Sequence, residues 1–288
     1  MDLIYRYDPF QPIVVRRPAN VEEALTALLE GNLRLVNLVQ QMQSATLGES
    51  PETATIVPIS PVSLGLPIWA GATLDQQPFA MVLGCSDARV PIESIFDQSF
   101  NEMFVVRVAG NVLGTEGLGS FDYAVRHLGR GMQIVAVLGH TGCGAVTAAV
   151  DTYLSPNEYA DVSFSHALRT LVDRVMIAVR GASKSIDRHF GQEIQEHPQY
   201  RAALIDVAVY LNAAITAFDL RQELNEVGSD DIAVYYGVCD LQTMLVTSAP
   251  VTDDTTGPDL RLAPCDADEF VALGTQLVER LVASGLLG

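Results

Sequence analysis

The sequence predicts an α/β protein with a mainly parallel β-sheet flanked by helices and with an N-terminal helical arm. Four short apolar runs rich in β-branched residues are the first observation: FAMVLG, MFVVRVA, IVAVLG and IAVYYGV. Continuous apolar runs are typical of strands buried on both faces, as parallel strands are. Stretches with helical periodicity lie between the runs, and this alternation of strand and helix favours parallel connections.

The first predicted element is an amphipathic helix over residues 20–43. Apolar side chains recur at helical spacing from Val21 to Leu29. Asn20, with Glu23 three positions later, forms the capping pattern that begins many helices. We therefore assign residues 1–45 to an N-terminal helical arm.

Prolines dominate the segment that follows this helix. Each proline removes a backbone hydrogen-bond donor and discourages regular structure. We predict an extended connection over residues 46–78, which contains Pro51, Pro58, Pro61, Pro67 and Pro78.

The remaining residues, 79–288, are predicted to form the α/β core. The four strands start at Phe79, Met103, Ile134 and Ile232. The helical candidates read GSFDYAVRHL, GAVTAAVDTYL, SHALRTLVDRVMIAV, YRAALIDVAVYLNAAITAFDLRQEL and, as the closing helix, DEFVALGTQLVERLVASGLL. No pattern requires a second domain, so we expect one domain over residues 1–288.

Composition narrows the class of protein. With 288 residues, 49% of them hydrophobic, the chain has enough apolar material for a sizeable core. A formal charge of -18 repels phosphate backbones and anionic lipid surfaces, so we expect neither nucleic acid nor membrane as a partner. The start, MDLIYRYDPFQP, lacks a basic segment followed by an apolar one, which predicts a cytoplasmic protein without a signal peptide.

Metal-ligating residues follow two of the predicted strands. The first strand run ends at Cys85 and the third at His140, with Cys143 three positions later. In an open parallel sheet, ligands bind beyond the carboxyl ends of the strands. Two thiolates and an imidazole suit Zn²⁺, and three protein ligands leave the fourth tetrahedral position for water, which is the catalytic pattern.

Each of these residues also has a purely structural interpretation. A lone cysteine at a strand end is usually a small buried hydrophobe, which is the interpretation we give to Cys239 and Cys265. His140 alone is equally explained as a core histidine, and the glycines around it as a tight turn. The conjunction of ligands at two separate strand ends favours the metal site.

Asp87 and Arg89 alternate with Cys85 in the stretch GCSDARVP. In an extended segment, residues two apart share a face, so all three side chains are expected to face the metal. The carboxylate can accept a hydrogen bond from metal-bound water while the guanidinium keeps it ionised and oriented. Two alternatives are a surface ion pair of little energetic weight, and Asp87 as a fourth zinc ligand that displaces the water.

The stretches CSDARVP and HTGCGAV together resemble the signature of the β-class carbonic anhydrases, Cys-x-Asp-x-Arg followed by His-x-x-Cys. The resemblance extends from about Gln76 to Val146 and includes MFVVRVAGNV and GSFDYAVRHL. It implies that Zn²⁺ is bound by Cys85, His140 and Cys143, and that Asp87 with Arg89 forms a dyad that orients zinc-bound hydroxide.

The resemblance also implies a reaction and an assembly. The family catalyses the reversible hydration of CO2 to bicarbonate and a proton through zinc-bound hydroxide. Gln76, Phe104 and Tyr123 fall at positions similar to the family's substrate pocket, although for Phe104 and Tyr123 taken alone core packing is the favoured interpretation. The family forms homodimers or higher homo-oligomers in which the N-terminal helix lies across the partner, a role for which residues 20–43 are the candidate.

Parts of the chain depart from the family's pattern. Cys239 stands where the family usually has a tyrosine, and residues 44–75 and about 151–200, the latter taken as an insertion, match nothing in it. One subgroup has a tryptophan at the position of Val82, where it helps an inhibitory bicarbonate site, so Val82 favours an open site. Two further functions stay open: hydrolysis of CS2 or COS at the same site, and a non-catalytic bicarbonate sensor or scaffold.

Overall fold

The structure is a computed structural model that describes residues 3–7, 17–48, 55–59, 71, 75–129, 131–155, 157, 165–229 and 231–287. Most of the predicted extended connection lies outside these residues, as does part of the predicted insertion. Within the connection, β2 (Thr55–Ile59) pairs in parallel with β1 (Leu3–Tyr7) as a two-stranded sheet.

The central sheet has the strand order β4-β3-β5-β6-β7, with β8 also paired to β6. Its members are β3 (Ala80–Gly84), β4 (Met103–Arg107), β5 (Ile134–His140), β6 (Ala233–Cys239), β7 (Val246–Thr247) and β8 (Arg261–Leu262). The first four strands are mutually parallel, whereas β7 and β8 run antiparallel to β6. The prediction of a mainly parallel sheet is confirmed, and each parallel strand begins within one residue of its predicted start.

Alternate residues of the strands face two separate hydrophobic cores. Leu83 and Val137 point into the larger core, and Val82 and Ala136 point into the smaller one. β3 and β5 are buried along their whole lengths. This burial on both faces explains why their sequences are continuous apolar runs.

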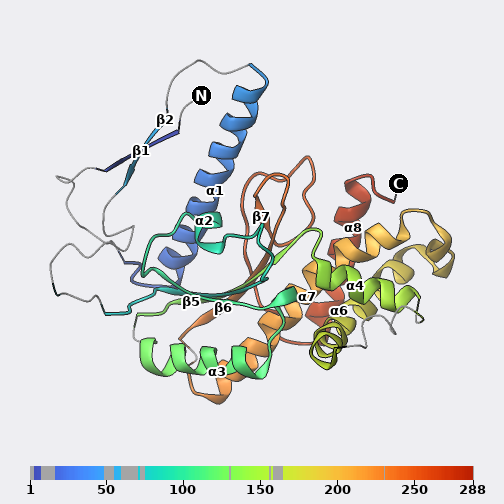
Figure 1. The fold of residues 1–288 in the computed structure, drawn as a ribbon. Helices are drawn as coiled ribbons and strands as arrows, with labels where there is room; N and C mark the ends of the chain where they lie inside the picture. Colours follow the sequence, from blue (N-terminus) through green and yellow to red (C-terminus); the bar gives the residue numbers. More distant parts are fainter. Residues whose placement is uncertain are drawn as a thin grey trace.

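Helices on the larger-core face form most of the molecule's bulk (Figure 1). They are α3 (Thr115–Tyr123), the π-helix η3 (Ala124–Leu128), α4 (Gly144–Leu154), α6 (His166–Phe190), α7 (Tyr200–Glu226) and α8 (Ala267–Ala283), with the short 3-10 turns η2 (Ala109–Asn111) and η5 (Gln192–Glu196) between them. α6 lies in the predicted insertion, yet Val172, Val175 and Val179 belong to the larger core. This helix is therefore part of the folded centre.

α1 (Val21–Thr46) and the short α2 (Ile92–Ile95) cover the opposite face. As predicted, Asn20 caps α1, and its Oδ1 accepts a hydrogen bond of 2.9 Å from the Glu23 N–H. Buried Asn32 anchors the helix through hydrogen bonds to backbone groups of Ile95, Met244 and Val246. The second half of α1 extends away from the sheet (Figure 1).

One described helix, α7, is long and apolar enough to cross a membrane by length and composition, with a mean hydropathy of 1.6. However, 78% of that apolar window is buried inside the protein. α7 packs against β5, β6 and the helices α4, α6 and α8. Its apolar character is therefore that of a core helix.

Candidate metal centre

The candidate site lies where the order of the sheet reverses. From β3 the chain moves to β4 on one side, and then returns to place β5 on the other side of β3. The carboxyl ends of β3 and β5 are therefore adjacent at the point where the strand order reverses, which is the place where open α/β sheets bind ligands. Cys85 follows β3, and His140 ends β5.

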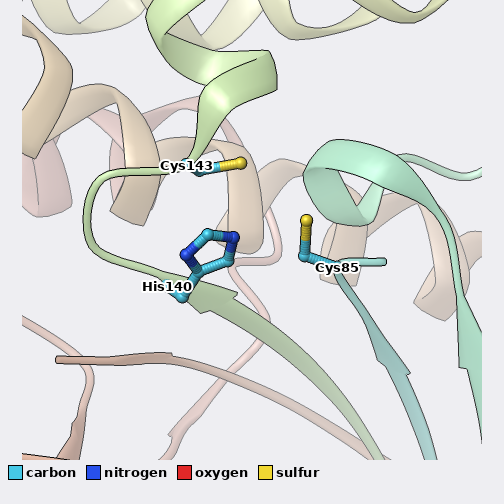
Figure 2. Close-up of side chains that lie close together, drawn as sticks. All are labelled: Cys85, His140 and Cys143. Atoms are coloured by element: carbon cyan, nitrogen blue, oxygen red, sulfur yellow. The ribbon is translucent and has the colours of Figure 1, made fainter. Parts of the chain in front are cut away.

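Three side chains converge beyond these strand ends. One ligand atom each from Cys85, His140 and Cys143 lies within 4.8 Å of the others. Figure 2 shows both sulfurs and the edge of the imidazole ring directed at a common point. All three residues are buried, with exposed fractions of 4%, 0% and 1% respectively. The predicted convergence of two strand ends is present in the structure.

The hydrogen bond of His140 decides which ring nitrogen can bind a metal. Its Nδ1 lies 3.0 Å from the backbone oxygen of Thr141, so Nδ1–H donates to that carbonyl. Nε2 is buried and has no hydrogen-bond partner among the described residues. A buried polar atom without a partner is costly, and metal-binding histidines are fixed by this kind of bond from the other ring nitrogen. Nε2 is therefore the ring nitrogen that is available to bind a metal.

The two thiols differ in their pKa. A hydrogen bond from Cys143 is the largest cause that lowers the pKa of Cys85 to about 4. The neighbouring His140 ring and the Asp87 and Gly110 N–H groups lower the pKa of Cys85 further, while burial opposes them. The same sulfur pair raises the pKa of Cys143. At neutral pH the pair therefore carries a thiolate, the form in which cysteine binds metals.

Asp87 and Arg89 form a bidentate ion pair beside the three ligands. Arg89 Nε donates to Asp87 Oδ1 at 3.0 Å, and Arg89 Nη2 donates to Oδ2 at 2.7 Å. These bonds hold the pKa of Asp87 well below its usual range. Oδ2 of Asp87 lies 3.8 Å from His140 Nε2, so the carboxylate is next to that ring nitrogen.

Asp87 is placed by a turn, which corrects the sequence interpretation of this stretch as extended. We expected alternation along an extended segment, but β3 ends at Gly84, and a turn in which the Val90 N–H donates to the Asp87 oxygen follows. Arg89 consequently points at Asp87 and at the Gly142 oxygen, 3.4 Å away, rather than at the metal ligands. Gly142 has a φ of 63°, a conformation that glycine adopts without a steric penalty.

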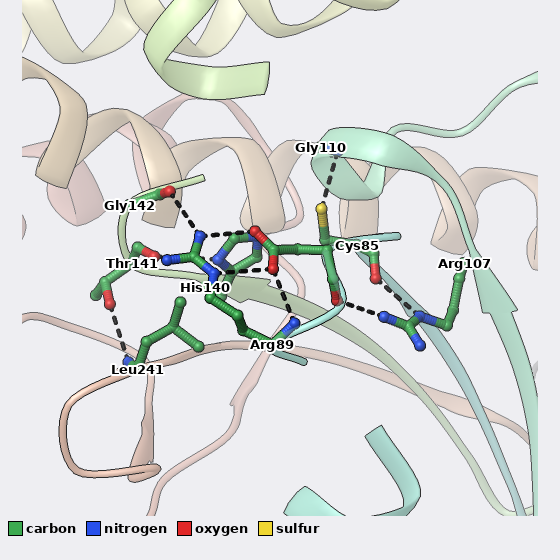
Figure 3. Close-up of polar contacts among 9 residues, drawn as sticks. Cys85, Arg89, Arg107, Gly110, His140, Thr141, Gly142 and Leu241 are labelled. Atoms are coloured by element: carbon green, nitrogen blue, oxygen red, sulfur yellow. Dashed lines mark hydrogen bonds and ion pairs between the residues drawn. The ribbon is translucent and has the colours of Figure 1, made fainter. Parts of the chain in front are cut away.

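Figure 3 shows polar contacts that the sequence interpretation did not identify. Arg107, at the end of β4, donates to the backbone oxygens of Cys85 at 3.0 Å and Asp87 at 2.5 Å. The Gly110 N–H donates to Cys85 Sγ at 3.3 Å. Both residues lie in the quoted stretch MFVVRVAGNV, but only the placement of β4 beside β3 reveals these contacts.

Two of the three predicted substrate-pocket residues, Phe104 and Tyr123, lie close together in the structure. The rings of Phe104 and Tyr123 lie 6.4 Å apart between centroids, and Tyr123 is 49% exposed. Core packing therefore does not account for Tyr123. Gln76 is exposed in the stretch that leads into β3. The roles of these three residues in binding substrate stay predictions.

The other two cysteines occupy different surroundings. Cys239 is buried in the smaller core, on the opposite face from Cys85 and Cys143, as its interpretation as a small hydrophobe predicted. Cys265 is exposed, contrary to that interpretation, because it precedes the capped start of α8. Its thiol and its N–H both donate to the Glu269 carboxylate.

Comparison with known proteins agrees with this site. The family model described as Carbonic anhydrase matches residues 80–244, which is more than half of the chain and contains all three candidate ligands. "Carbonic anhydrase 2" of Mycobacterium tuberculosis is 49% identical over 81 residues, or 28% of this chain and 38% of that protein. "Carbonic anhydrase" of Mycolicibacterium smegmatis is 38% identical over 143 residues, which are 48% of this chain and 66% of that protein.

The matched region spans well under half the length of the first of these relatives. Among solved structures, the Coccomyxa β-carbonic anhydrase in complex with acetazolamide is 21% identical, covers 60% of this chain and 72% of its own, and has a TM-score of 0.44. The assignment to a family rests on the family model and on the bacterial relatives. It does not use the likeness to the solved structure. On the extent of the family match, the chain belongs to the β-carbonic anhydrase family.

Proposed function

We propose that this protein is a zinc enzyme that catalyses the reversible hydration of CO2 to bicarbonate and a proton. The observation that carries the proposal is the buried convergence of Cys85, His140 and Cys143, with the unpartnered Nε2 of His140 facing the two sulfurs. Membership of the family supports the same reaction.

The donor set of the site fits zinc. Two cysteine sulfurs and one histidine nitrogen are common Zn²⁺ ligands, whereas Mg²⁺ and Ca²⁺ prefer oxygen. Bound in such a set, zinc lowers the pKa of water to about 7 and so supplies a nucleophile at neutral pH. The Thr141 carbonyl fixes the His140 ring for this role, and the Gly110 N–H fixes the Cys85 sulfur.

Asp87 is suited to orient the nucleophile by accepting a hydrogen bond from it. Arg89 keeps the pKa of Asp87 low, so the carboxylate stays ionised and acts as an acceptor throughout the working pH range. A carboxylate oxygen can accept two hydrogen bonds. Oδ1 of Asp87 already accepts from the backbone N–H and Nε of Arg89, whereas Oδ2 accepts from Arg89 Nη2 and can accept one more. For the same reason Asp87 does not store the proton that the reaction releases, which leaves through another group or through solvent.

A stopped-flow measurement of CO2 hydration by the zinc-loaded protein tests the proposal. We expect a rate above the buffer background that rises between about pH 7 and pH 9, as the nucleophile forms. Cys143→Ser is expected to lose both zinc and activity. A zinc-loaded protein with no rate above background contradicts the enzyme and favours the non-catalytic alternative, while faster turnover of CS2 or COS favours the hydrolase.

We also infer that the chain forms a homo-oligomer through α1. All buried residues of this helix lie between Ala24 and Val36, and residues 37–46 include none. Met42 and Leu47 are 48% and 74% exposed within the described part of the chain. A second copy is the partner implied by the family resemblance. Sedimentation of the wild type and of Met42→Glu tests this, and a monomeric wild type contradicts it.

A further inference from the structure

We propose that Asn212 is a positioning residue of the metal centre, because it holds the Gly110 turn in the geometry that keeps the Gly110 N–H on the Cys85 sulfur. The inference rests on the proposed metal site. It concerns a residue of the core helix α7, far from the Cys-x-Asp-x-Arg and His-x-x-Cys motifs in the sequence.

Two hydrogen bonds connect α7 to the sulfur. Asn212 is 3% exposed, and its Nδ2 donates to the Gly110 oxygen at 2.7 Å across 102 positions of sequence. The N–H of the same Gly110 donates to Cys85 Sγ at 3.3 Å (Figure 3). The peptide groups on both sides of Gly110 are thus tied, one to Asn212 and the other to the thiolate.

Gly110 needs an external constraint of this kind. Its φ is 69°, and glycine populates positive and negative φ about equally, so the residue itself does not fix the turn. A Cβ at Gly110 would lie 2.9 Å from Ala145 Cβ in α4, so a bulkier residue does not fit without a shift. No side chain at position 110 can restrain the turn. The Asn212 amide on α7 restrains it instead, through its hydrogen bond to the Gly110 oxygen.

The expected consequence is a change at the metal. A hydrogen bond to a ligating sulfur fixes its direction and draws charge from it, and the loss of such outer contacts typically weakens metal binding about 10–100-fold. Without the Asn212 amide, the Gly110 carbonyl loses its donor and the turn is free to rotate the N–H away from Cys85.

Asn212→Ala and Asn212→Leu test the inference. Leucine keeps most of the side-chain volume and so provides a folded sample if the alanine variant is too unstable. Zinc affinity is measured by competition with a chromophoric chelator, and the sulfur environment by the thiolate-to-metal charge-transfer absorption of the Co²⁺-loaded protein. We expect about 10-fold weaker zinc binding or more, together with a shifted charge-transfer band.

Asn32→Ala and Asn32→Leu are the matched controls. Asn32 is also a fully buried asparagine that bonds only backbone groups, but these belong to Ile95, Met244 and Val246. Its variants are expected to lose stability while keeping the zinc affinity and the absorption band. Wild-type values in the Asn212 variants, or an equal shift in both sets, overturn the inference. The proposed reaction is tested separately, by measuring CO2 hydration by the wild type.

Discussion

At the scale of single residues, the part of the chain that the structure describes contains two bidentate aspartate–arginine pairs. Asp87 with Arg89 lies beside the metal ligands, whereas Asp151 with Arg201 joins α4 to α7 with nitrogen–oxygen distances of 2.6 and 2.9 Å. Both pairs are bidentate, so geometry alone does not distinguish them. What distinguishes Asp87 is the 3.8 Å distance from its Oδ2 to His140 Nε2.

Asp87→Asn is expected to keep zinc and to lower the rate of CO2 hydration about 100-fold or more, since the amide can donate where the carboxylate only accepts. Metal analysis and stopped-flow kinetics of the purified variant check this. Asp151→Asn removes the matching pair away from the ligands and should leave both quantities unchanged. Loss of zinc from Asp87→Asn would instead indicate that Asp87 is a ligand.

A partly buried carboxyl group on α7 gives the protein a second pH-dependent feature. Burial, with a smaller contribution from Asp240, raises the pKa of Asp206 to about 6, against about 4 in the unfolded chain. The folded protein therefore binds this proton more tightly than the unfolded chain does. Its stabilising contribution is present below about pH 4 and is lost as the pH rises through about 6.

We expect Asp206→Asn to raise the free energy of unfolding by about 2 kcal/mol at pH 8, where the wild type must keep a partly buried charge. Near pH 4 the gain should shrink towards zero, because the wild-type carboxyl is then protonated when folded. Urea unfolding of both proteins at the two pH values measures the difference. An equal gain at both pH values would show that packing, rather than ionisation, is responsible.

At the scale of elements, α1 contacts the segment after α2 through Gly31, which has no side chain. A Cβ at Gly31 would lie 1.7 Å from the backbone oxygen of Phe96, so helix and segment touch directly. The same part of α1 carries Asn32, whose bonds reach Ile95 and Val246. The arm is therefore fixed to the core by its first half.

Gly31→Ala is expected to lower the free energy of unfolding by about 1–3 kcal/mol, because a backbone carbonyl cannot move aside as a side chain can. The gain of about 1 kcal/mol in helix propensity does not compensate for this overlap. Chemical denaturation measures the change. Gly119→Ala in α3 is the control, since its Cβ meets no atom within 4 Å and should be neutral or stabilising. Equal effects at both positions would contradict the close approach.

The parallel strands were predictable because a strand that is buried on both faces has a continuous apolar sequence. The apolar runs predicted β3 to β6, and Gly144–Leu154 has the bounds expected for α4. The length of α6 was not predictable in the same way. Its last turns, after Val179, are amphipathic with several basic residues, and their burial depends on α4, α7 and α8 packing around them.

At the scale of the whole molecule, the candidate metal centre brings together the ends of two strands that are far apart in the sequence. Cys85 follows β3, while His140 and Cys143 flank the turn after β5. Ions that bind only the folded arrangement stabilise it by mass action. Zinc is therefore expected to act on global stability as well as on the reaction.

Free zinc at about 100 times its dissociation constant should raise the free energy of unfolding by about 2.7 kcal/mol. A chelator should reverse the effect, and thermal unfolding with and without zinc measures it. Mg²⁺ serves as the control ion, because it prefers oxygen ligands. The Cys143→Ser variant should show no zinc-dependent gain, and a gain of wild-type size in that variant would contradict the assignment of Cys143.

The convergence of the three candidate ligands was predictable from the sequence, but the contacts that hold them in place were not. Cys85, His140 and Cys143 are recognisable because sulfur and imidazole at two strand ends have few other uses together. Arg107, Gly110 and Asn212 act through backbone groups of other residues, and such contacts leave no residue-type pattern. The turn that brings Asp87 to His140 was likewise visible only once the end of β3 was known.

X-ray absorption at the zinc edge of the metal-loaded protein tests the central claim most directly. If Cys85, His140 and Cys143 bind one ion, the spectrum will show two sulfur ligands at about 2.3 Å and two nitrogen or oxygen ligands at about 2.0–2.1 Å. The Cys143→Ser variant, where it retains any zinc, should lose one sulfur. A zinc ion surrounded only by nitrogen and oxygen, or by a single sulfur in the wild type, would contradict the account.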